Sequence, residues 1–339
     1  MADTVLVTGS TGHLGYNLVR ELVRAGYRVR AGVRDPGDRE RTAPLRELDV
    51  EIVPAPIEDE DRLYAAARGA DGFFHLAALT KMWARDPESE VIRPNVRGVE
   101  NALRAAKRAG VRRVVMTSSV MAMGSLAPPD RPLTEADWND DREATHYGLA
   151  KTRAERRAWE LASELGVDLV TINPSSMIGP GYFRHTPMTW LVELMVRGYV
   201  RCVLPATPAW VDVRDAATAH RLAYEIPEAS GRYLVSAVSM SFGDMVNRMH
   251  ELDGRIPRVR WPVPLAVLRV FAGLDLLLHL LTGAERRLTG AILDQFFGGE
   301  MHCSSEKARR ELGWQARPFD QTLADTIEWV RSRRGPWWR

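Results

Sequence analysis

The sequence contains little cysteine and almost no net charge. It has two cysteines in 339 residues, Cys202 and Cys303, and 46 Lys and Arg residues against 44 Asp and Glu. Two cysteines cannot form a disulfide framework, so we expect small buried groups in a reducing compartment. A nearly neutral chain also has no overall field that would draw it to nucleic acid or to an anionic membrane, although local basic patches are possible. We therefore expect no nucleic-acid partner.

Signals for metal binding and secretion are also lacking. The eight histidines show no metal-ligand spacing, so we expect no metal site. The N-terminus runs directly into Val5-Leu6-Val7 without a basic or longer apolar segment, which argues against a signal peptide and favours the cytoplasm.

One apolar stretch, residues 262–283, approaches the length of a membrane span. It carries Arg269, Asp275 and His279, and an Arg or Asp at the centre of a span costs roughly 2.5–3.5 kcal/mol. We therefore expect no transmembrane span. The stretch is predicted to form an amphipathic helix that serves as core or substrate lid, with contact to a membrane surface as the alternative.

The chain does contain a regular alternation of short β-branched segments with helical stretches. The expected strands are residues 4–8, 28–33, 50–53, 72–76, 112–117 and 168–173, and the expected helices are residues 12–25, 60–67, 88–109 and 143–165. This alternation is typical of βαβ units that build a parallel sheet. We predict an α/β fold with a doubly wound parallel sheet (Rossmann) that binds ligands at the carboxyl ends of its strands.

The alternation breaks after Asn173-Pro174, which suggests a second, smaller lobe. Residues 1–174 with 211–236 are predicted to form the dinucleotide-binding domain, and residues 211–224 would return to its sheet as a strand and helix. Residues 175–210 with 237–320 would form a mostly helical substrate-binding lobe, and residues 321–339 a C-terminal helix and tail.

A glycine-rich motif connects the first expected strand to the first expected helix. It reads Thr8-Gly-Ser-Thr-Gly-His-Leu-Gly15. Glycine permits a tight turn and close backbone approach, and the free amides of a helix N-terminus can hydrogen-bond a pyrophosphate. We predict that a dinucleotide is bound by Gly9, Thr11, Gly12, His13, Leu14 and Gly15.

The end of the second expected strand carries Arg34 followed by Asp35. A protein that prefers NAD usually has a carboxylate here, whereas an arginine can form a charge-assisted pair with a 2′-phosphate. NADPH is therefore the expected cofactor, with NADH possible. Asp35 would weaken or reverse the preference if its carboxylate faces the ribose. Arg39 and Arg41 are expected on the following loop, either adding positive potential or simply solvated.

Tyr147 and Lys151 lie four residues apart at the start of an expected helix, so both side chains can share one face. A nearby ammonium favours the phenolate, so the lysine would lower the pKa of the tyrosine. The pair predicts proton transfer near neutral pH.

Together these motifs resemble the extended short-chain dehydrogenase/reductase family, most closely its dihydroflavonol-reductase-like and 3β-hydroxysteroid-dehydrogenase-like group. The likeness covers almost the whole chain. It also includes residues 29–36, 74–78, 95–98, 117–119, 173–180, 211–215 and 304–314.

The resemblance implies a catalytic triad. Ser119 would orient a substrate carbonyl, Tyr147 would donate the proton, and Lys151 would hold the nicotinamide ribose and lower the tyrosine pKa. Ser119 is preferred to Ser118 because Gly124 then follows five residues later, an offset common in this family.

The resemblance also implies further cofactor contacts. Ala77 and Ala78 would let the cofactor pass close by, and Pro174 and Ser176, with Ser175 between them, would border the nicotinamide. Pro56-Ile57 stands where many relatives carry Asp-Leu or Asp-Val beside the adenine, so Ile57, or else Glu58 or Asp59, would supply that contact.

The leading hypothesis is a reversible, NADPH-dependent reductase of a hydrophobic or polycyclic ketone or aldehyde, or of a β-keto acyl compound. Tyr182, His185 and Trp190 follow the expected nicotinamide border and are candidate substrate contacts. We expect a small-molecule carbonyl partner and a monomer or homodimer. The alternatives are a nucleotide-sugar epimerase or dehydratase with tightly bound NAD, against which Arg34 argues, and a non-catalytic dinucleotide sensor, against which the retained triad argues.

Overall fold

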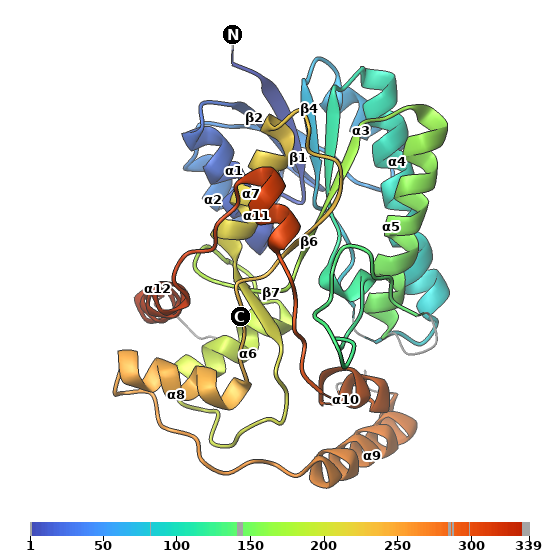
Figure 1. The fold of residues 1–339 in the computed structure, drawn as a ribbon. Helices are drawn as coiled ribbons and strands as arrows, with labels where there is room; N and C mark the ends of the chain where they lie inside the picture. The colour runs from blue at the N-terminus through green and yellow to red at the C-terminus, as the bar shows by residue number, and fades with distance from the viewer. Residues whose placement is uncertain are drawn as a thin grey trace.

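A seven-stranded parallel sheet forms the centre of the larger domain (Figure 1). The computed structural model describes residues 2–81, 83–140, 145–283, 286, 288–297 and 299–333. The strand order is β3-β2-β1-β4-β5-β6-β9. These strands are β1 (Thr4–Thr8), β2 (Arg28–Val33), β3 (Glu51–Pro54), β4 (Gly72–His75), β5 (Arg113–Thr117), β6 (Leu169–Pro174) and β9 (Gly231–Val235). The predicted doubly wound fold is confirmed, and its seventh strand, β9, is the one that was not expected.

Helices cover both faces of this sheet (Figure 1). One face packs against α1 (His13–Arg24), α2 (Arg39–Arg46), α7 (Val213–Glu225) and α11 (Glu306–Leu312). The other packs against α3 (Glu60–Ala67), α4 (Arg93–Ala109) and α5 (His146–Leu165). The central strands are therefore buried on both faces, which explains their nearly continuous apolar sequence.

Strand register aligns the carboxyl ends of the central strands. Thr8 of β1 pairs with His75 of β4, and His75 pairs with Met116 of β5. Two short irregular helices lie at this edge: the π-helical turn Glu88–Ile92 before α4 and the 3₁₀ turn Val120–Ala122 after β5.

The smaller lobe is built around a three-stranded sheet of β7 (Ser176–Ile178), β8 (Ala209–Asp212) and β10 (Val238–Ser239). Its hydrophobic core contains Trp210 and residues of α6 (Pro187–Val196), α8 (Phe242–Leu252) and α12 (Phe319–Ser332). Helices α9 (Leu265–Thr282) and α10 (Gly290–Phe297) pack together at its far end (Figure 1).

The structure differs from the sequence expectations in three places. The strand expected to return to the main sheet is β8, which pairs instead with β7 and β10; α7 alone returns to the main domain. Arg39 and Arg41 lie in a helix rather than a loop, because Asp38 caps the N-terminus of α2 and Leu45 is buried. Helix α11 and Trp314, expected in the substrate lobe, pack on the larger domain, while α12 joins the smaller lobe.

The indole of Trp314 attaches this late segment to the larger domain. It is fully buried, and its Nε1 donates a hydrogen bond to the Asp215 carbonyl at 2.8 Å. Trp314→Ala should lower the free energy of unfolding by about 3–5 kcal/mol, because it leaves a cavity in the core. Trp261→Ala removes an indole that is 79% exposed and should change the free energy of unfolding by less than about 0.5 kcal/mol. Denaturant unfolding measures both, and equal losses would contradict the assignment.

Candidate functional site

The β1–α1 loop forms a backbone cradle that only glycine permits. Gly9 has a φ of +72°, and a Cβ on it would lie 2.9 Å from the amide nitrogen of Ala77. A Cβ on Gly15 would lie 2.0 Å from the Gly9 carbonyl oxygen. Gly12 donates its N–H to that same carbonyl at 2.9 Å and caps the N-terminus of α1. The loop therefore brings α1, with its free first-turn amides, beside the end of β4, an arrangement that suits a phosphate group.

His13 and Leu14 of this motif point into the protein. The His13 Nε2 donates to the carbonyls of Gly179 and Pro180, at 3.1 and 3.2 Å. Burial lowers the pKa of His13 to about 4, although these two hydrogen bonds oppose the shift. Leu14 is part of the hydrophobic core. Their side chains thus tie the loop to the segment after β7, and only their backbone can face a ligand; Thr11 is half-buried within the loop.

Arg34 follows the end of β2 and is largely exposed. Its side chain is 67% exposed, and its Nε lies 4.0 Å from Oε1 of Glu58. Asp35 accepts a hydrogen bond from the Gly37 amide at 2.8 Å, so its carboxylate closes its own turn. The Asp35 carboxylate is therefore engaged with its own turn, whereas the exposed Arg34 side chain is accessible to a ligand.

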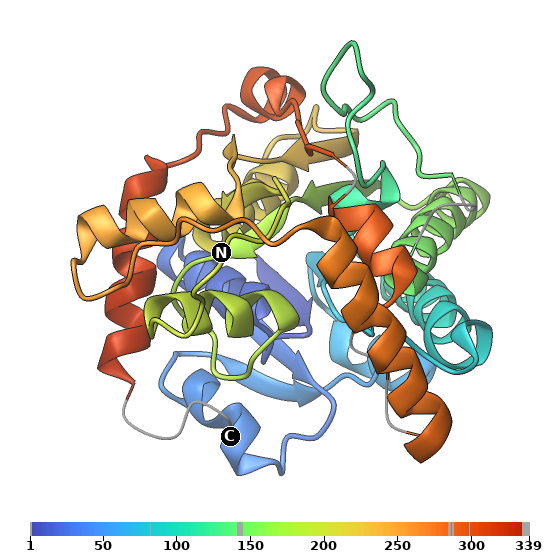
Figure 2. The same ribbon diagram turned by 90° about the horizontal axis from the view of Figure 1, so that it is seen from below.

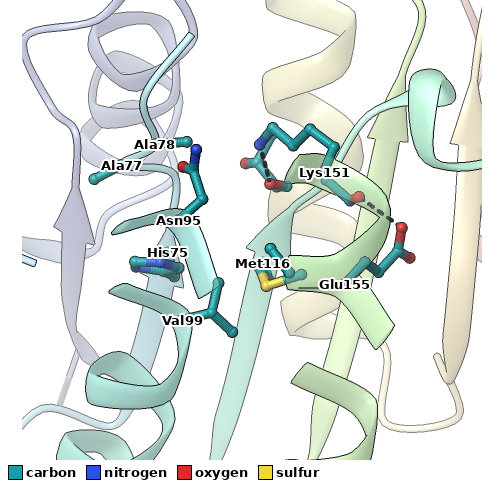
Figure 3. A pocket seen from close by; sticks show the side chains of 11 residues that line it. His75, Ala77, Ala78, Asn95, Val99, Met116, Lys151 and Glu155 are labelled. Atoms are coloured by element: carbon teal, nitrogen blue, oxygen red, sulfur yellow. Dashed lines mark hydrogen bonds between the residues drawn. The ribbon is translucent and has the colours of Figure 1, made fainter. Parts of the chain in front are cut away.

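Ile57 and the alanine pair flank this edge. The Ile57 carbonyl accepts a hydrogen bond from Asn101 Nδ2 at 2.9 Å. The Ile57 side chain packs against Gly98, where an added Cβ would lie 2.8 Å from Ile57 Cδ1. Ala77 and Ala78 follow β4 beside Gly9 and line a pocket with Asn95 and Lys151 (Figure 3).

Figure 3 shows that pocket between two groups of side chains, with Ala77, Ala78 and Asn95 across from Lys151 and Glu155. His75 lies on the same side as the alanines, and its Nδ1 is 3.1 Å from the Thr8 hydroxyl. Burial lowers the pKa of His75 to about 3, and the Lys151 charge adds to the shift. His75 is therefore neutral and structural at neutral pH.

Ser119, Tyr147 and Lys151 converge at the carboxyl end of β5. Ser119 follows the strand, is buried, and accepts the Met121 N–H at 3.2 Å. Its hydroxyl also hydrogen-bonds the Tyr147 phenol. Lys151, one helical turn further along α5, donates from Nζ to the Thr117 carbonyl at 3.1 Å. The structure therefore brings the three residues of the expected triad together.

The pKa shifts in this group differ from the sequence expectation. Burial raises the pKa of Tyr147, and the hydrogen bond from Ser119 only partly opposes that rise. Burial lowers the pKa of Lys151 to about 8, against the attraction of Glu155. The expected lowering of the tyrosine pKa by lysine is therefore absent, because the phenol packs against an apolar cluster and the ammonium is directed at Thr117. At neutral pH the phenol keeps its proton.

Glu155 and Arg232 form a buried ion pair behind the triad that the sequence reasoning missed. The Glu155 Oε1 accepts from Arg232 Nε at 2.9 Å, and both side chains are almost fully buried. Glu155 also accepts from Ser118, Thr171 and Asn173, at 2.6 to 2.9 Å. The one sequence signal for this ion pair is a carboxylate four residues after Lys151, on the inner face of the same helix.

The residues expected to border the nicotinamide lie at the end of β6. Pro174 pairs with Val235 of β9, and Ser176 begins β7. Between them, Ser175 has a buried hydroxyl with no hydrogen-bond partner among the described residues. Asn173 Nδ2 donates to the Ser119 carbonyl at 3.2 Å, which places this border beside the triad.

The three candidate substrate residues have different surroundings. Tyr182 is 1% exposed in the core of the smaller lobe, and its hydroxyl donates to Glu193 at 3.3 Å. His185 Nε2 lies 3.5 Å from the same buried carboxylate. Trp190 is 45% exposed. Tyr182 and His185 thus have structural partners in this conformation, and only Trp190 offers a large free surface.

The described residues contain no group of three or more His, Cys, Asp or Glu side chains that could hold a metal ion.

Comparisons with known proteins identify relatives along the whole chain. The profile of the NAD dependent epimerase/dehydratase family matches residues 5–236. The cinnamoyl-CoA reductase CAD2 of Medicago truncatula is 32% identical over 98% of this chain and 97% of its own. The dihydroflavonol 4-reductase of Zea mays is 36% identical over 69% of this chain and 70% of its own. The crystal structure of gox2253 superimposes with a TM-score of 0.83 and 30% identity, covering 97% of this chain and 98% of that one.

The lowered pKa of Lys151 predicts a pH-dependent stability. The lysine pKa falls from 10.5 to about 8 on folding, so the unfolded chain binds more protons between these values and stability rises with pH across them. Below pH 8 the buried ammonium costs about 3 kcal/mol. Lys151→Met should therefore be more stable than the native chain at pH 7, and the difference should vanish above about pH 10.

Denaturant unfolding of both proteins across this pH range tests the prediction. Lys107→Met, at an exposed position on α4, should show no such pH-dependent gain. A Lys151→Met protein that is less stable at pH 7, or whose advantage does not change with pH, would contradict it.

Proposed function

Because this chain belongs to the NAD dependent epimerase/dehydratase family, within the extended short-chain dehydrogenases/reductases, and is an NAD(P)-dependent oxidoreductase, we propose that it reduces a hydrophobic ketone or aldehyde with NADPH. The reaction is reversible in principle, and the reverse direction oxidises the corresponding alcohol. The observation that carries the proposal is the convergence of Ser119, Tyr147 and Lys151 at the end of β5, beside the glycine cradle.

The cradle fits a dinucleotide. At Gly9 and Gly15 a Cβ would collide with backbone atoms, so glycine permits this tight loop, and the first-turn amides of α1 face the same end of the sheet. These amides would hold the pyrophosphate, with Thr11 and Gly12 in the turn. Arg34 would pair with the 2′-phosphate. Ile57 would border the adenine, and the nicotinamide half would pass Ala77 and Ala78 toward Pro174 and Ser176.

The protein side chains perform the proton chemistry. A nicotinamide cofactor, when bound, would supply the hydride for the carbonyl carbon. The Ser119 hydroxyl donates a hydrogen bond to the carbonyl oxygen and aligns it with the phenol. As negative charge grows on that oxygen, Tyr147 donates its proton, so that one hydride and one proton convert C=O to CH–OH. The raised pKa of Tyr147 keeps the phenol protonated before the reaction.

Lys151 completes the group in two ways. Its ammonium would hold the nicotinamide ribose, and its positive charge would stabilise the phenolate left after proton transfer. The Thr117 carbonyl fixes Nζ at the end of β5, so the charge is already in place.

The apolar surroundings of the Tyr147 phenol favour an apolar substrate. Tyr147 packs against the buried cluster of Val120, Met121, Met123 and Leu133. The names of the relatives describe reductases of cinnamoyl-CoA and of dihydroflavonol, which supports reduction as the working direction. Trp190 is the candidate for substrate contact whose side chain is exposed.

Tyr147→Phe tests the proton donor. Removal of the hydroxyl should lower kcat by about 10²–10⁴ with little change in NADPH affinity, since general acid catalysis contributes about that factor. Turnover is measured as NADPH oxidation with a panel of hydrophobic ketones and aldehydes. Tyr64→Phe, on α3, is the control and should keep the native rate. Native turnover in Tyr147→Phe would exclude the phenol as donor.

Arg34→Gln tests the cofactor preference. It should lower kcat/KM for NADPH by about 10- to 100-fold, as expected for loss of a charge-assisted phosphate contact worth about 1.5–3 kcal/mol, and leave kcat/KM for NADH within a few-fold. Arg24→Gln, at the end of α1, should change neither. Equal losses with both cofactors would contradict the phosphate assignment. Release of tightly bound NAD from the purified native protein would instead favour an epimerase.

A further inference from the structure

Helix α9 presents an apolar face that no described element covers. Of its eighteen residues, only Leu268 and Ala272 are buried. Nine large apolar side chains are 40% to 75% exposed: Val267, Val270, Phe271, Leu274, Leu276, Leu277, Leu278, Leu280 and Leu281. By length and composition α9 could cross a membrane, and only 11% of it is buried in the protein. An exposed apolar patch of this extent marks an interaction surface.

Two polar side chains of α9, Asp275 and His279, are turned toward the protein, whereas Arg269 is 66% exposed and lies 3.9 Å from Asp294 Oδ1. At about 100° per residue, Asp275 and His279 share the face of the two buried residues. Asp275 accepts from Arg286 Nε at 3.2 Å, and the His279 ring meets Trp83 edge-on at 5.0 Å. The opposite half of the helix carries no charge. This arrangement reverses that of a surface helix in a water-soluble protein, where the polar face is outside.

A basic and aromatic rim adjoins this apolar face. Trp261 is 79% exposed, and Arg258 and Arg260 beside it are exposed and form no ion pair with any described residue. The Val203 amide donates to the Trp261 carbonyl at 2.9 Å, so exposed Arg201 lies near the same rim. Figure 2 shows α9 and the connection from α8 to α9 on the near side of the molecule.

We propose that α9 docks on the surface of an anionic lipid bilayer. The docking face consists of the outward residues of α9 with Arg258, Arg260 and Trp261. The helix would lie in the plane of the interface, with its leucines among the acyl chains, the indole at headgroup depth and the guanidinium groups on lipid phosphates.

Charge favours lipid over a second copy of the chain. A two-fold contact sets the same surface against itself. Of the four arginines in residues 254–283, Arg255 pairs with Asp253 and Arg269 lies near Asp294, while Arg258 and Arg260 have no acidic partner among the described residues. Two copies would therefore oppose arginine to arginine. Anionic headgroups supply the missing opposite charge.

The docking face adjoins the end of the molecule where the candidate site lies. Trp83, which contacts His279, belongs to the segment after Ala77 and Ala78, and Arg85 donates to the Gly283 carbonyl at 3.0 Å. A docked molecule would present this end to the lipid. The docking itself does not depend on the reaction proposed above.

Vesicle co-sedimentation of the full chain tests the proposal. The native protein should bind vesicles of phosphatidylcholine with phosphatidylglycerol more tightly than phosphatidylcholine alone. Leu277→Glu with Leu281→Glu should lower the partition coefficient by about tenfold or more. Arg258→Gln with Arg260→Gln should lower it roughly 30-fold on the anionic vesicles only, since each of the two cations near the surface contributes about 1 kcal/mol.

The control matches the charge change at the other end of the molecule. Ala65→Glu with Lys107→Gln, at exposed positions on α3 and α4, alters net charge by the same amount as the leucine pair and should leave vesicle binding unchanged. Thermal unfolding of each variant verifies that it is folded.

Three results would overturn the proposal. In the first, the native protein does not bind vesicles, light scattering shows that it is a dimer, and the variant with both leucine substitutions is a monomer. This result would assign the face to a second copy of the chain. The second is a loss of binding by the control equal to that of the leucine pair. The third is a native protein that only detergent extracts from membranes, which would make α9 a span.

Discussion

The buried carboxylate of Glu155 is the interaction on which the rest of the site depends. It is fully buried on α5 and accepts hydrogen bonds from Ser118 after β5, from Thr171 and Asn173 on β6, and from Arg232 on β9. A buried charge costs several kcal/mol unless such a set of donors is complete. The four elements therefore satisfy the carboxylate only when all are in their native places.

This constraint positions the candidate triad. Ser119 follows Ser118 directly, and its carbonyl accepts from Asn173, which also donates to Glu155. Lys151 lies one turn before Glu155 on the same helix and is held by Thr117. Arg232 extends the network outward, since its guanidinium stacks on Trp138 at 3.8 Å and donates to the carbonyls of Glu135 and Asp137. A structural ion pair and a reactive group thus share one framework, in which a buried lysine is tolerated at a cost in stability.

Much of the larger domain could be predicted from local pattern. The bounds of β1 and β2 follow from β-branched segments ended by glycine and charged turn residues. The strand expected to begin at residue 211 overlaps only the end of β8, which spans Ala209–Asp212. The expectation that β8 joins the main sheet is wrong, because the sequence of a short buried strand does not specify which neighbours it pairs with. Helix α2 was missed because it contains Pro44 and only two buried residues, so its periodicity is weak.

The sequence by itself determined the features that depend on backbone sterics and spacing along one element. These are the glycine cradle, in which Gly9 and Gly15 leave no room for a side chain, and the one-turn separation of Tyr147 from Lys151. Only the tertiary structure decided how groups distant in sequence change each other. It joined Arg232 to Glu155, raised rather than lowered the pKa of Tyr147, and turned the apolar half of α9 outward. Burial and ion pairing arise from contacts between separate elements, and a linear sequence does not specify which surfaces will meet.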